Sequence, residues 1–217
     1  MSISNNIFNL RKSLPFGVEL IAVSKTKPIQ VLDEAYHAGQ RHFGENKVQE
    51  MVQKYDVMPK DICWHMIGHL QSNKVKYMAS FVHLIHGVDN TSLLKEINKQ
   101  GRKHDRVIDC LLQIKIAQEE TKFGLKPEAA LAILQSQEYQ NFKFVRITGL
   151  MGMATFTTDT AQIQKEFELL KSTFDLFRNL DNRIKTLSMG MSGDFKIAIA
   201  CGSNLVRVGS LIFGERN

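Results

Sequence analysis

The sequence predicts an α/β fold, a single closed (β/α)8 (TIM) barrel. Short β-rich runs alternate with helical patterns from Val18 to Val208, and this alternation is typical of a parallel sheet whose crossovers are helices. Eight such runs are present, a number that favours a closed barrel over an open doubly wound sheet. The chain has only four prolines, and no low-complexity linker interrupts the pattern. We therefore expect one domain over residues 1–217.

The predicted strands are runs of apolar and β-branched residues bounded by polar residues or glycine. The first run, VELIAVS, is almost wholly apolar, whereas the second, HFGE, is very short. In chain order the eight strands are predicted over residues 18–24, 42–45, 63–68, 82–88, 107–116, 144–151, 186–190 and 204–209.

Apolar residues spaced three or four apart predict helices in the crossovers. Asp159 and Thr91 are suited to N-caps, and Gly39 and Gly101 are suited to C-caps. Brief helices are expected after the third and seventh strands. The longer helices are predicted over residues 29–39, 46–55, 91–101, 127–137 and 159–180.

The charge balance favours an anionic partner, which need not be a polymer. The chain has 28 Lys and Arg residues against 22 Asp and Glu residues, a formal charge of +6 and a pI near 9.2. The basic clusters NKVKYM and KQGRKHDR fall where helix faces or loops are expected, so they are typical of a solvated surface. Interleaved aromatic residues and a groove-reading element are absent from the sequence, so we expect no nucleic-acid partner.

Targeting and redox signals favour a cytoplasmic protein. No apolar run approaches the roughly 20 residues of a membrane span, and the first residues lack the unbroken apolar segment of a signal peptide. The three cysteines, Cys63, Cys110 and Cys201, are far apart and show neither pairing nor metal spacing. We expect neither disulfides nor membrane association.

The stretch VELIAVSKTKP ends an apolar strand on Lys25. A lysine at this place is usually a solvated strand end, and the alternative is an amine held in a pocket for chemistry. In a (β/α)8 barrel the site lies at the carboxyl ends of the strands. Lys25 would end the first strand and Asn46 the second, so both are expected at one mouth. Lys27, which precedes Pro28, is expected to face solvent.

The seventh and eighth strands lead into residues suited to holding a phosphate, which barrels of this kind often bind there. Ser192 precedes a short helical pattern, so its hydroxyl and the following amides can face an anion. Gly209 lets backbone approach a ligand closely, and the hydroxyl and amide of Ser210 can donate to phosphate oxygens. Each feature alone is common in caps and loops, but together they predict a phosphate cup.

An amine at the mouth and a phosphate cup on the far strands suggest a phosphorylated aldehyde bound as a Schiff base. Pyridoxal 5′-phosphate (PLP) fits that description.

Six sequence blocks span nearly the entire chain in order: AVSKTKP, HFGEN, WHMIGHLQSNK, GLMGM, LSMGMSGD and GSNLVRVGSLIFGER. Together they resemble the pyridoxal phosphate homeostasis protein family. The resemblance implies a single PLP-binding barrel of the alanine racemase N-terminal-domain type (PLP fold type III), with PLP bound to Lys25 as a Schiff base. It also implies that Arg207 faces the pyridine nitrogen, that Asn46 lies near the ring, and that Ser192, Gly209 and Ser210 hold the phosphate.

Four histidines could suggest a metal, namely His65, His69, His83 and His86. They are split between two strand regions without a ligand triad, so packing or hydrogen bonding is favoured and no metal site is predicted. Trp64 is expected to face the helix layer, because neighbouring residues of a strand point to opposite faces.

Three functions from different classes are compatible with these residues. The favoured one is a non-catalytic protein that binds, carries and buffers PLP and maintains PLP and amino-acid homeostasis, with PLP-dependent apoenzymes as possible recipients. The second is a PLP-dependent amino-acid racemase-like enzyme, and the third is a barrel enzyme that acts on a sugar phosphate through a lysine Schiff base.

A racemase needs a base on each face of the substrate Cα. The alanine racemases that this barrel resembles draw the second base, a tyrosine, from a β-rich domain that we do not expect beyond Asn217. The tyrosines of this chain fall in helical patterns or at their ends, at positions 36, 55, 77 and 139. We therefore expect no enzymatic turnover.

Overall fold

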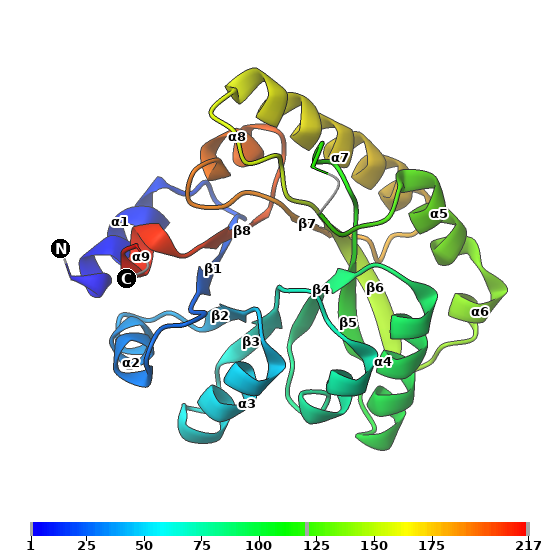
Figure 1. Ribbon diagram of the computed structural model, residues 1–217, viewed down its shortest axis with the longest axis horizontal. Coiled ribbons are helices and arrows are strands. Elements are labelled where there is room, and N and C mark those ends of the chain that lie inside the picture. Colours follow the sequence, from blue (N-terminus) through cyan, green and yellow to red (C-terminus); the bar gives the residue numbers. More distant parts are fainter. Residues whose placement is uncertain (1, 120–121, 216–217) are drawn as a thin grey trace.

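Eight parallel strands close into a barrel in the order of the sequence (Figure 1). The computed structural model describes residues 2–119 and 122–215. Strand β8 pairs with β1, with Leu20 opposite Val206, and this pairing closes the barrel. The predicted fold class is confirmed, and every predicted strand contains an observed one. The strands are β1 (Glu19–Val23), β2 (His42–Glu45), β3 (Cys63–Met66), β4 (Leu84–Val88), β5 (Ile108–Gln113), β6 (Val145–Met151), β7 (Thr186–Ser188) and β8 (Leu205–Val208).

Helices form the outer layer around the barrel (Figure 1). All five of the longer predicted helices are confirmed, and so are the brief ones after β3 and β7, which are η1 and α8. Three helices were not predicted from the sequence: α1, α6 and α9. The helices are α1 (Ile3–Ser13), α2 (Ile29–His37), α3 (Val48–Val57), the 3-10 helix η1 (Ser72–Tyr77), α4 (Thr91–Lys103), α5 (Pro127–Gln135), α6 (Gln137–Gln140), α7 (Thr160–Leu180), α8 (Phe195–Ala200) and α9 (Ser210–Phe213).

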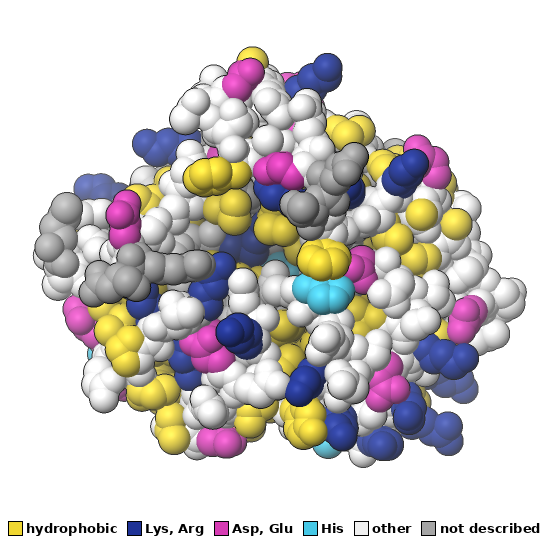
Figure 2. Space-filling model, in the orientation of Figure 1, with side chains coloured by type: hydrophobic (Ala, Val, Ile, Leu, Met, Phe, Trp, Pro, Cys, Tyr) yellow, Lys and Arg dark blue, Asp and Glu magenta, His cyan; other side chains and the backbone are white. Residues whose placement is uncertain are grey.

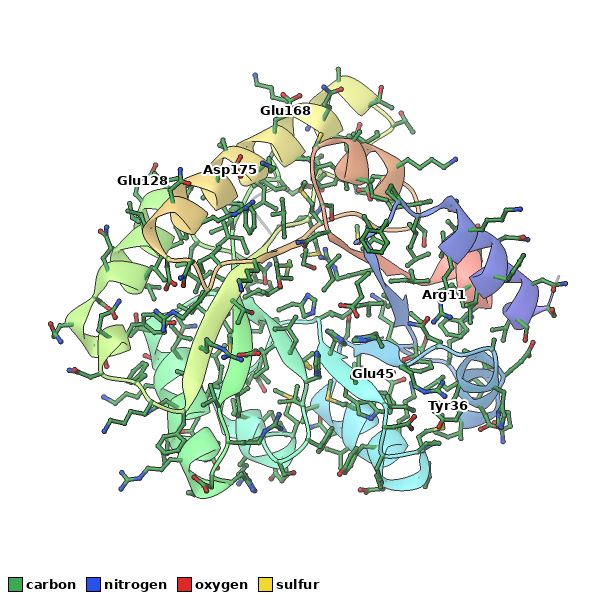
Figure 3. The ribbon with its side chains drawn as sticks, turned by 180° about the vertical axis from the view of Figure 1, so that it is seen from behind. Arg11, Tyr36, Glu45, Glu128, Glu168 and Asp175 are labelled. Carbon is green, nitrogen blue, oxygen red and sulfur yellow. The ribbon has the colours of Figure 1, made fainter. Side chains whose placement is uncertain are left out.

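Helix α1, near the amino terminus, packs against α9, near the carboxyl terminus. It buries Ile7 and Leu10, and its Asn6 donates to the carbonyl oxygen of Ile212 in α9 at 3.0 Å. Seen from behind, Arg11 lies on α1 next to α2 (Figure 3), where its guanidinium donates to the Gly39 carbonyl at 3.0 Å. These contacts hold α1 and α9 beside β1 and β8.

The helix caps are only partly as predicted. Asp159 caps α7, because its carboxylate accepts from the amides of Ala161 and Gln162. The prediction for Thr91 is wrong, since Asn90 is the N-cap of α4 and Thr91 is already helical.

Of the two predicted C-cap glycines, one is confirmed and one is wrong. Gly39 follows α2 with a φ of +87°, the left-handed conformation that favours glycine after a helix. Gly101 does not end α4, which continues to Lys103. Its role is close packing instead, because a Cβ there would lie 2.5 Å from the Phe144 carbonyl oxygen.

Two apolar regions stabilise the fold. The larger lies between the strands and the helices and includes Trp64 and Phe43, both fully buried, so the predicted orientation of Trp64 is confirmed. Each large side chain buried in this way contributes roughly 1.5–3 kcal/mol. The smaller region fills part of the barrel interior, and its members are Ile21, Leu84, Leu111, Met151 and Leu205. The rest of the interior is polar, and it forms the floor of the site described below.

No helix in the part of the chain that the structure describes is long and apolar enough to span a membrane. Cys63, Cys110 and Cys201 are free thiols.

Candidate functional site

A cavity of about 620 Å³ opens at the carboxyl ends of the strands, a size typical of small-molecule sites. Figure 2 shows it as a hollow near the middle of the face, with hydrophobic and basic side chains at its rim. The structure brings all the sequence-predicted site residues into its lining: Lys25, Asn46, Ser192, Arg207, Gly209 and Ser210. They meet because the carboxyl ends of all parallel strands lie on one side of a barrel.

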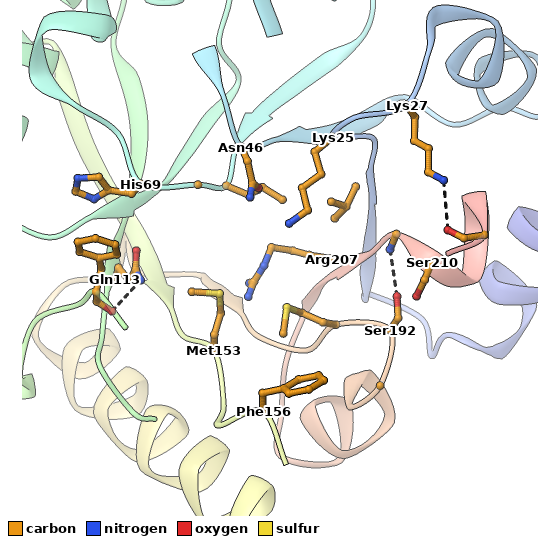
Figure 4. Close-up of a pocket in the computed structure, with 18 residues that line it drawn as sticks. Lys25, Lys27, Asn46, His69, Gln113, Met153, Phe156, Ser192, Arg207 and Ser210 are labelled. Atoms are coloured by element: carbon orange, nitrogen blue, oxygen red, sulfur yellow. Dashed lines mark hydrogen bonds between the residues drawn. The ribbon is translucent and has the colours of Figure 1, made fainter. Parts of the chain in front are cut away.

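Lys25 lies in a tight turn just after β1, and its side chain points into the cavity (Figure 4). The following residue, Thr26, has a φ of 64°, a left-handed conformation that is unfavourable for a β-branched residue. Two hydrogen bonds hold the turn: the Thr26 amide donates to Glu50 Oε1 at 2.6 Å, and Lys54 Nζ donates to the Ser24 carbonyl at 2.8 Å. Helix α3 therefore fixes the backbone that carries Lys25.

The same α3 residues belong to a buried charge cluster. Lys54 Nζ lies 2.8 Å from Glu45 Oε1 and 2.7 Å from Glu50 Oε1, and the hydroxyl of Ser24 donates to Glu45 Oε1 at 2.6 Å. Burial raises the pKa of Glu45, and the charge of Lys54 opposes that shift. Removing one partner of such a buried pair costs about 3–5 kcal/mol. Sequence reasoning missed this cluster, since its members are joined only by the packing of α3 on β1 and β2.

The predicted phosphate cup is formed by the loops after β7 and β8. The amide of Gly209 donates to Ser192 Oγ at 3.2 Å (Figure 4), so the hydroxyl proton of Ser192 can be donated toward the cavity. A Cβ at Gly209 would lie 3.2 Å from the carbonyl oxygen of Val23, which leaves little room for any other residue. Ser210 begins α9 directly after this glycine.

One detail of the predicted cup is wrong. Ser192 does not directly precede a helix, because α8 begins only at Phe195 and its N-cap is Asp194. The carboxylate of Asp194 accepts from the Met191 amide at 2.5 Å and fixes the loop. Ser192 therefore bridges the two loops and does not cap α8.

The prediction for Lys27 also requires a correction. Its side chain does not simply face solvent: it lines the cavity, and Nζ donates to the carbonyl oxygens of Phe213, Gly214 and Glu215 at 3.1, 3.4 and 3.2 Å. These backbone acceptors lie at the end of α9 and just after it, far from Lys27 in the sequence. The lysine thus ties the segment after α9 to the β1 side of the cup.

Arg207 projects from β8 into the centre of the site (Figure 4), and only 3% of it is exposed. Its Nη1 donates to Ser188 Oγ at 2.5 Å and its Nη2 to the Gly152 carbonyl at 3.0 Å. Burial lowers the pKa of Arg207 to about 10, and the negative charge of Asp194 opposes that shift. The guanidinium therefore remains a cation at neutral pH.

A row of polar side chains crosses the barrel beneath Arg207. Ser188 Oγ lies 3.1 Å from His86 Nδ1, and His86 Nε2 lies 3.0 Å from His65 Nδ1. His65 Nε2 lies 2.9 Å from His42 Nδ1, and His42 Nε2 lies 2.8 Å from Glu19 Oε1. We call these five residues the histidine row. Packing or hydrogen bonding was the predicted role of His65 and His86, and the structure shows hydrogen bonds for both.

The two ends of the histidine row are compatible with one direction of hydrogen bonding when its rings are neutral. Arg207 can only donate to Ser188, which leaves the serine hydroxyl proton available to His86. At the other end the Glu19 carboxylate accepts from His42, whose Nδ1 then accepts from the next ring. Burial holds the pKa of His86 well below its ordinary value, and the nearby Arg207 cation lowers it further. The core of the row is therefore uncharged at neutral pH.

The rim of the cavity is partly aromatic. The rings of His69 and Phe123 are stacked with centroids 4.3 Å apart, and the side-chain amide of Gln113 donates to the Phe123 carbonyl at 2.9 Å. Phe156 is 95% exposed at the opposite side of the rim. A planar ligand would find apolar surfaces at this entrance.

A lysine at the barrel mouth, a serine-lined cup after β7 and β8 and a buried arginine between them define a class of protein: (β/α)8 barrels built to bind a small anionic molecule. The chain belongs to the alanine racemase N-terminal domain family, whose model matches residues 1–217, and within it to the pyridoxal phosphate homeostasis proteins.

Two relatives carry the name "Pyridoxal phosphate homeostasis protein". The one from Aquifex aeolicus is 39% identical over 201 residues, which are 91% of this chain and 87% of that protein. The one from Schizosaccharomyces pombe is 39% identical over 206 residues, which are 92% of this chain and 85% of that protein.

Solved structures also resemble this chain. PipY of Synechococcus elongatus PCC7942 is 35% identical and has been solved without PLP (TM-score 0.92) and with PLP bound (TM-score 0.89), each covering 98% of this chain and 100% of that one. An alanine racemase from Clostridium difficile 630 is 12% identical, with a TM-score of 0.81 over 99% of this chain and 56% of that chain. The racemase therefore shares the fold alone.

Buried His86 makes folding stability depend on pH. The unfolded chain takes up a proton there below the ordinary pKa of 6.5, whereas the folded pKa is well below that value. Neutral His86 therefore leaves the free energy of unfolding at its full value above pH 6.5. As the pH falls from 6.5 toward the folded pKa, the free energy of unfolding decreases by up to about 1.4 kcal/mol per pH unit. Chemical denaturation at a series of pH values should give a shallower slope for His86→Asn. The exposed control His37→Asn should leave the slope unchanged, and equal slopes for all three proteins would contradict the assignment.

Proposed function

We propose that this protein binds PLP in the cavity at the carboxyl ends of the strands and carries and buffers it, without turning over amino acids. We also infer that residues 1–217 act as one PLP-binding domain and that the protein acts in the cytoplasm, with PLP-dependent apoenzymes as recipients. The observation that carries the proposal is the placement of Lys25, Arg207 and the serine cup around one cavity.

The residues present fit the cofactor. The cavity volume of about 620 Å³ accommodates a ligand of this size. The hydroxyls of Ser192 and Ser210 supply the donors that a phosphate needs, and Gly209 lines the same cavity. The names of the relatives and the PLP-bound PipY structure support the same cofactor.

Each residue has a distinct task in this proposal. Lys25 Nζ would hold the aldehyde carbon covalently, while Ser192, Gly209 and Ser210 bind the phosphate. Asn46 and Arg207 line the same cavity, where Asn46 would lie near the ring and Arg207 would face its pyridine nitrogen. Bound PLP supplies an aldehyde and an electron-withdrawing ring. A permanent cation beside the ring nitrogen disfavours protonation of that nitrogen and so weakens the ring as an electron sink.

The positions of the tyrosines support the absence of turnover. None of the four, all of which lie among the described residues, lines the cavity. Tyr36 donates to Asp61, Tyr55 stacks on Phe81, and the hydroxyl of Tyr139 accepts from the Ile147 amide. Racemisation would therefore lack the second base that a tyrosine supplies.

A second candidate function, a racemase-like enzyme, is favoured by one observation. His69 lines the same cavity as Lys25, so two groups able to carry protons share one site. The ring of His69 stacks on Phe123 at the rim, which favours an aromatic entrance over a second base.

Reduction with borohydride should fix PLP on Lys25. Peptide mass mapping of the reduced protein should find the pyridoxyl group on the peptide that contains Lys25, and Lys25→Ala should lose the covalent link while retaining weaker binding through the cup. Lys27→Ala serves as the matched control and should still be labelled on Lys25. A pyridoxyl group found mainly on Lys27 or Lys74 would remove the assignment.

The phosphate cup makes a separate prediction about affinity. Ser210→Ala removes a donor to a charged group, which should weaken PLP binding by about ten- to a hundredfold. Pyridoxal, which lacks the phosphate, should bind poorly and should be insensitive to the substitution. Fluorescence titration of the wild-type protein, Ser210→Ala and the surface control Ser172→Ala provides the comparison. The cup is misplaced if pyridoxal binds as tightly as PLP.

The PLP form should not exchange the Cα hydrogen of amino acids over many turnovers. Incubation with single L-amino acids in deuterated water, followed by NMR and chiral chromatography, measures both exchange and change of configuration. Steady multiple turnover that Lys25→Ala abolishes would establish an enzyme in place of a carrier.

A further inference from the structure

The end of the barrel opposite the cavity gathers three side chains with metal-binding atoms. His42 and Cys63 are the first residues of β2 and β3 and lie opposite each other in the parallel register. His83 directly precedes β4, and its amide donates to the Trp64 carbonyl at 2.8 Å. The ligand atoms of His42, Cys63 and His83 all lie within 4.8 Å of one another. We call these three residues the lower cluster.

A carboxylate lies beside the lower cluster. Glu19 is the first residue of β1, and its Oε1 lies 2.8 Å from His42 Nε2. Two imidazoles and one thiolate are donors that suit tetrahedral Zn²⁺, for which nitrogen and sulfur ligands lie at about 2.0–2.3 Å. We propose that the lower cluster binds Zn²⁺ at the amino-terminal end of the barrel, with a solvent molecule in the fourth coordination position.

The surroundings of His42 meet a second requirement of a metal ligand. A metal-bound histidine donates its other ring N–H to a partner, which fixes the orientation of the ring. His42 Nδ1 lies 2.9 Å from His65 Nε2. Coordination through Nε2 displaces the Nε2 proton and places a proton on Nδ1, which donates to His65. This reverses the donor direction of the metal-free histidine row, and Ser188 Oγ then accepts from both His86 and Arg207. The rings of His42, His65 and His83 also pack against one another, with centroids 5.1–5.6 Å apart. The ligand rings are thus held in place before an ion arrives.

The lower cluster is open to solvent. His83 is exposed, and His42 and Cys63 are half-buried, so a hydrated ion can reach all three. Burial and the negative charge of Glu19 raise the pKa of the Cys63 thiol, and coordination replaces its proton, which passes to solvent. The bound ion exchanges its other waters for the protein ligands, with no change of oxidation state.

This site was not predicted from the sequence. The expectation of no metal weighed His83 with three other histidines but not His42, and it judged Cys63 only by its spacing from the other cysteines. His42 and Cys63 are 21 residues apart in the chain. Only the register of β2 and β3 brings them together.

The test uses the full-length protein, loaded with PLP, stripped of metal and free of any affinity tag. Competition titration against a chromophoric chelator should detect one tightly bound Zn²⁺ per chain. Cys63→Ser and His83→Ala should each weaken binding at least about tenfold. The matched controls Cys201→Ser and His104→Ala change the same residue types outside both the lower cluster and the cavity, and they should bind Zn²⁺ as the wild type does.

Co²⁺ gives a readout on the wild-type protein that needs no variant. A tetrahedral site with a thiolate should produce strong visible d–d bands and a thiolate-to-cobalt charge-transfer band in the near ultraviolet, in the difference spectrum against the Co²⁺-free PLP form. Cys63→Ser should lose the charge-transfer band, while circular dichroism confirms that the variant is folded. The proposal fails if no equivalent of Zn²⁺ binds tightly, if binding survives both Cys63→Ser and His83→Ala, or if Co²⁺ shows only octahedral spectra. The proposed zinc site does not depend on the assignment of PLP to Lys25.

Discussion

A buried arginine inside the barrel is the constraint on which the rest of the interior depends. Removing a charge from water is costly unless hydrogen bonds and opposite charges compensate, and Arg207 is only 3% exposed. Its compensation comes from Ser188 and from the Gly152 carbonyl. Ser188 Oγ accepts from the guanidinium, and its hydroxyl proton is available to His86, in the direction that the Glu19 carboxylate sets at the other end of the histidine row. The buried cation and this carboxylate thus stand at the two ends of the polar interior of an otherwise apolar fold.

Lys25 is held in place by helix α3 of the outer layer. A strained turn carries this lysine, and strain of this kind persists only where the surroundings fix it. Here α3 supplies the fixing groups, since Glu50 accepts from the turn and Lys54 donates to it. Lys54 is in turn paired with Glu45, which lies on β2. Lys25 and Arg207 are therefore positioned by two separate networks, one outside the barrel wall and one within it.

Much of the site could be predicted because parallel strands place their carboxyl ends on one side. Once the alternation of strands and helices indicated a barrel, Lys25, Asn46 and Ser192 had to lie at the same mouth, whatever their separation in sequence. Glycine and serine after the last strands indicated the cup for a local reason, namely backbone access and hydroxyl donors. The errors were also local. Thr91 was taken as a cap although Asn90 makes the capping hydrogen bond, and neighbouring polar residues of this kind are hard to distinguish by sequence.

The sequence by itself determined the fold class, the strand order and the face on which the site lies, because hydrophobic periodicity and strand–helix alternation are properties of neighbouring residues. The tertiary structure decided which side chains meet across strands. Lys27 reaches carbonyls near the end of the chain, and His42 lies beside Cys63. These contacts depend on the register between strands and on the packing of helices. Strand register and helix packing are determined by the burial of apolar side chains throughout the core, so no short stretch of sequence predicts these contacts.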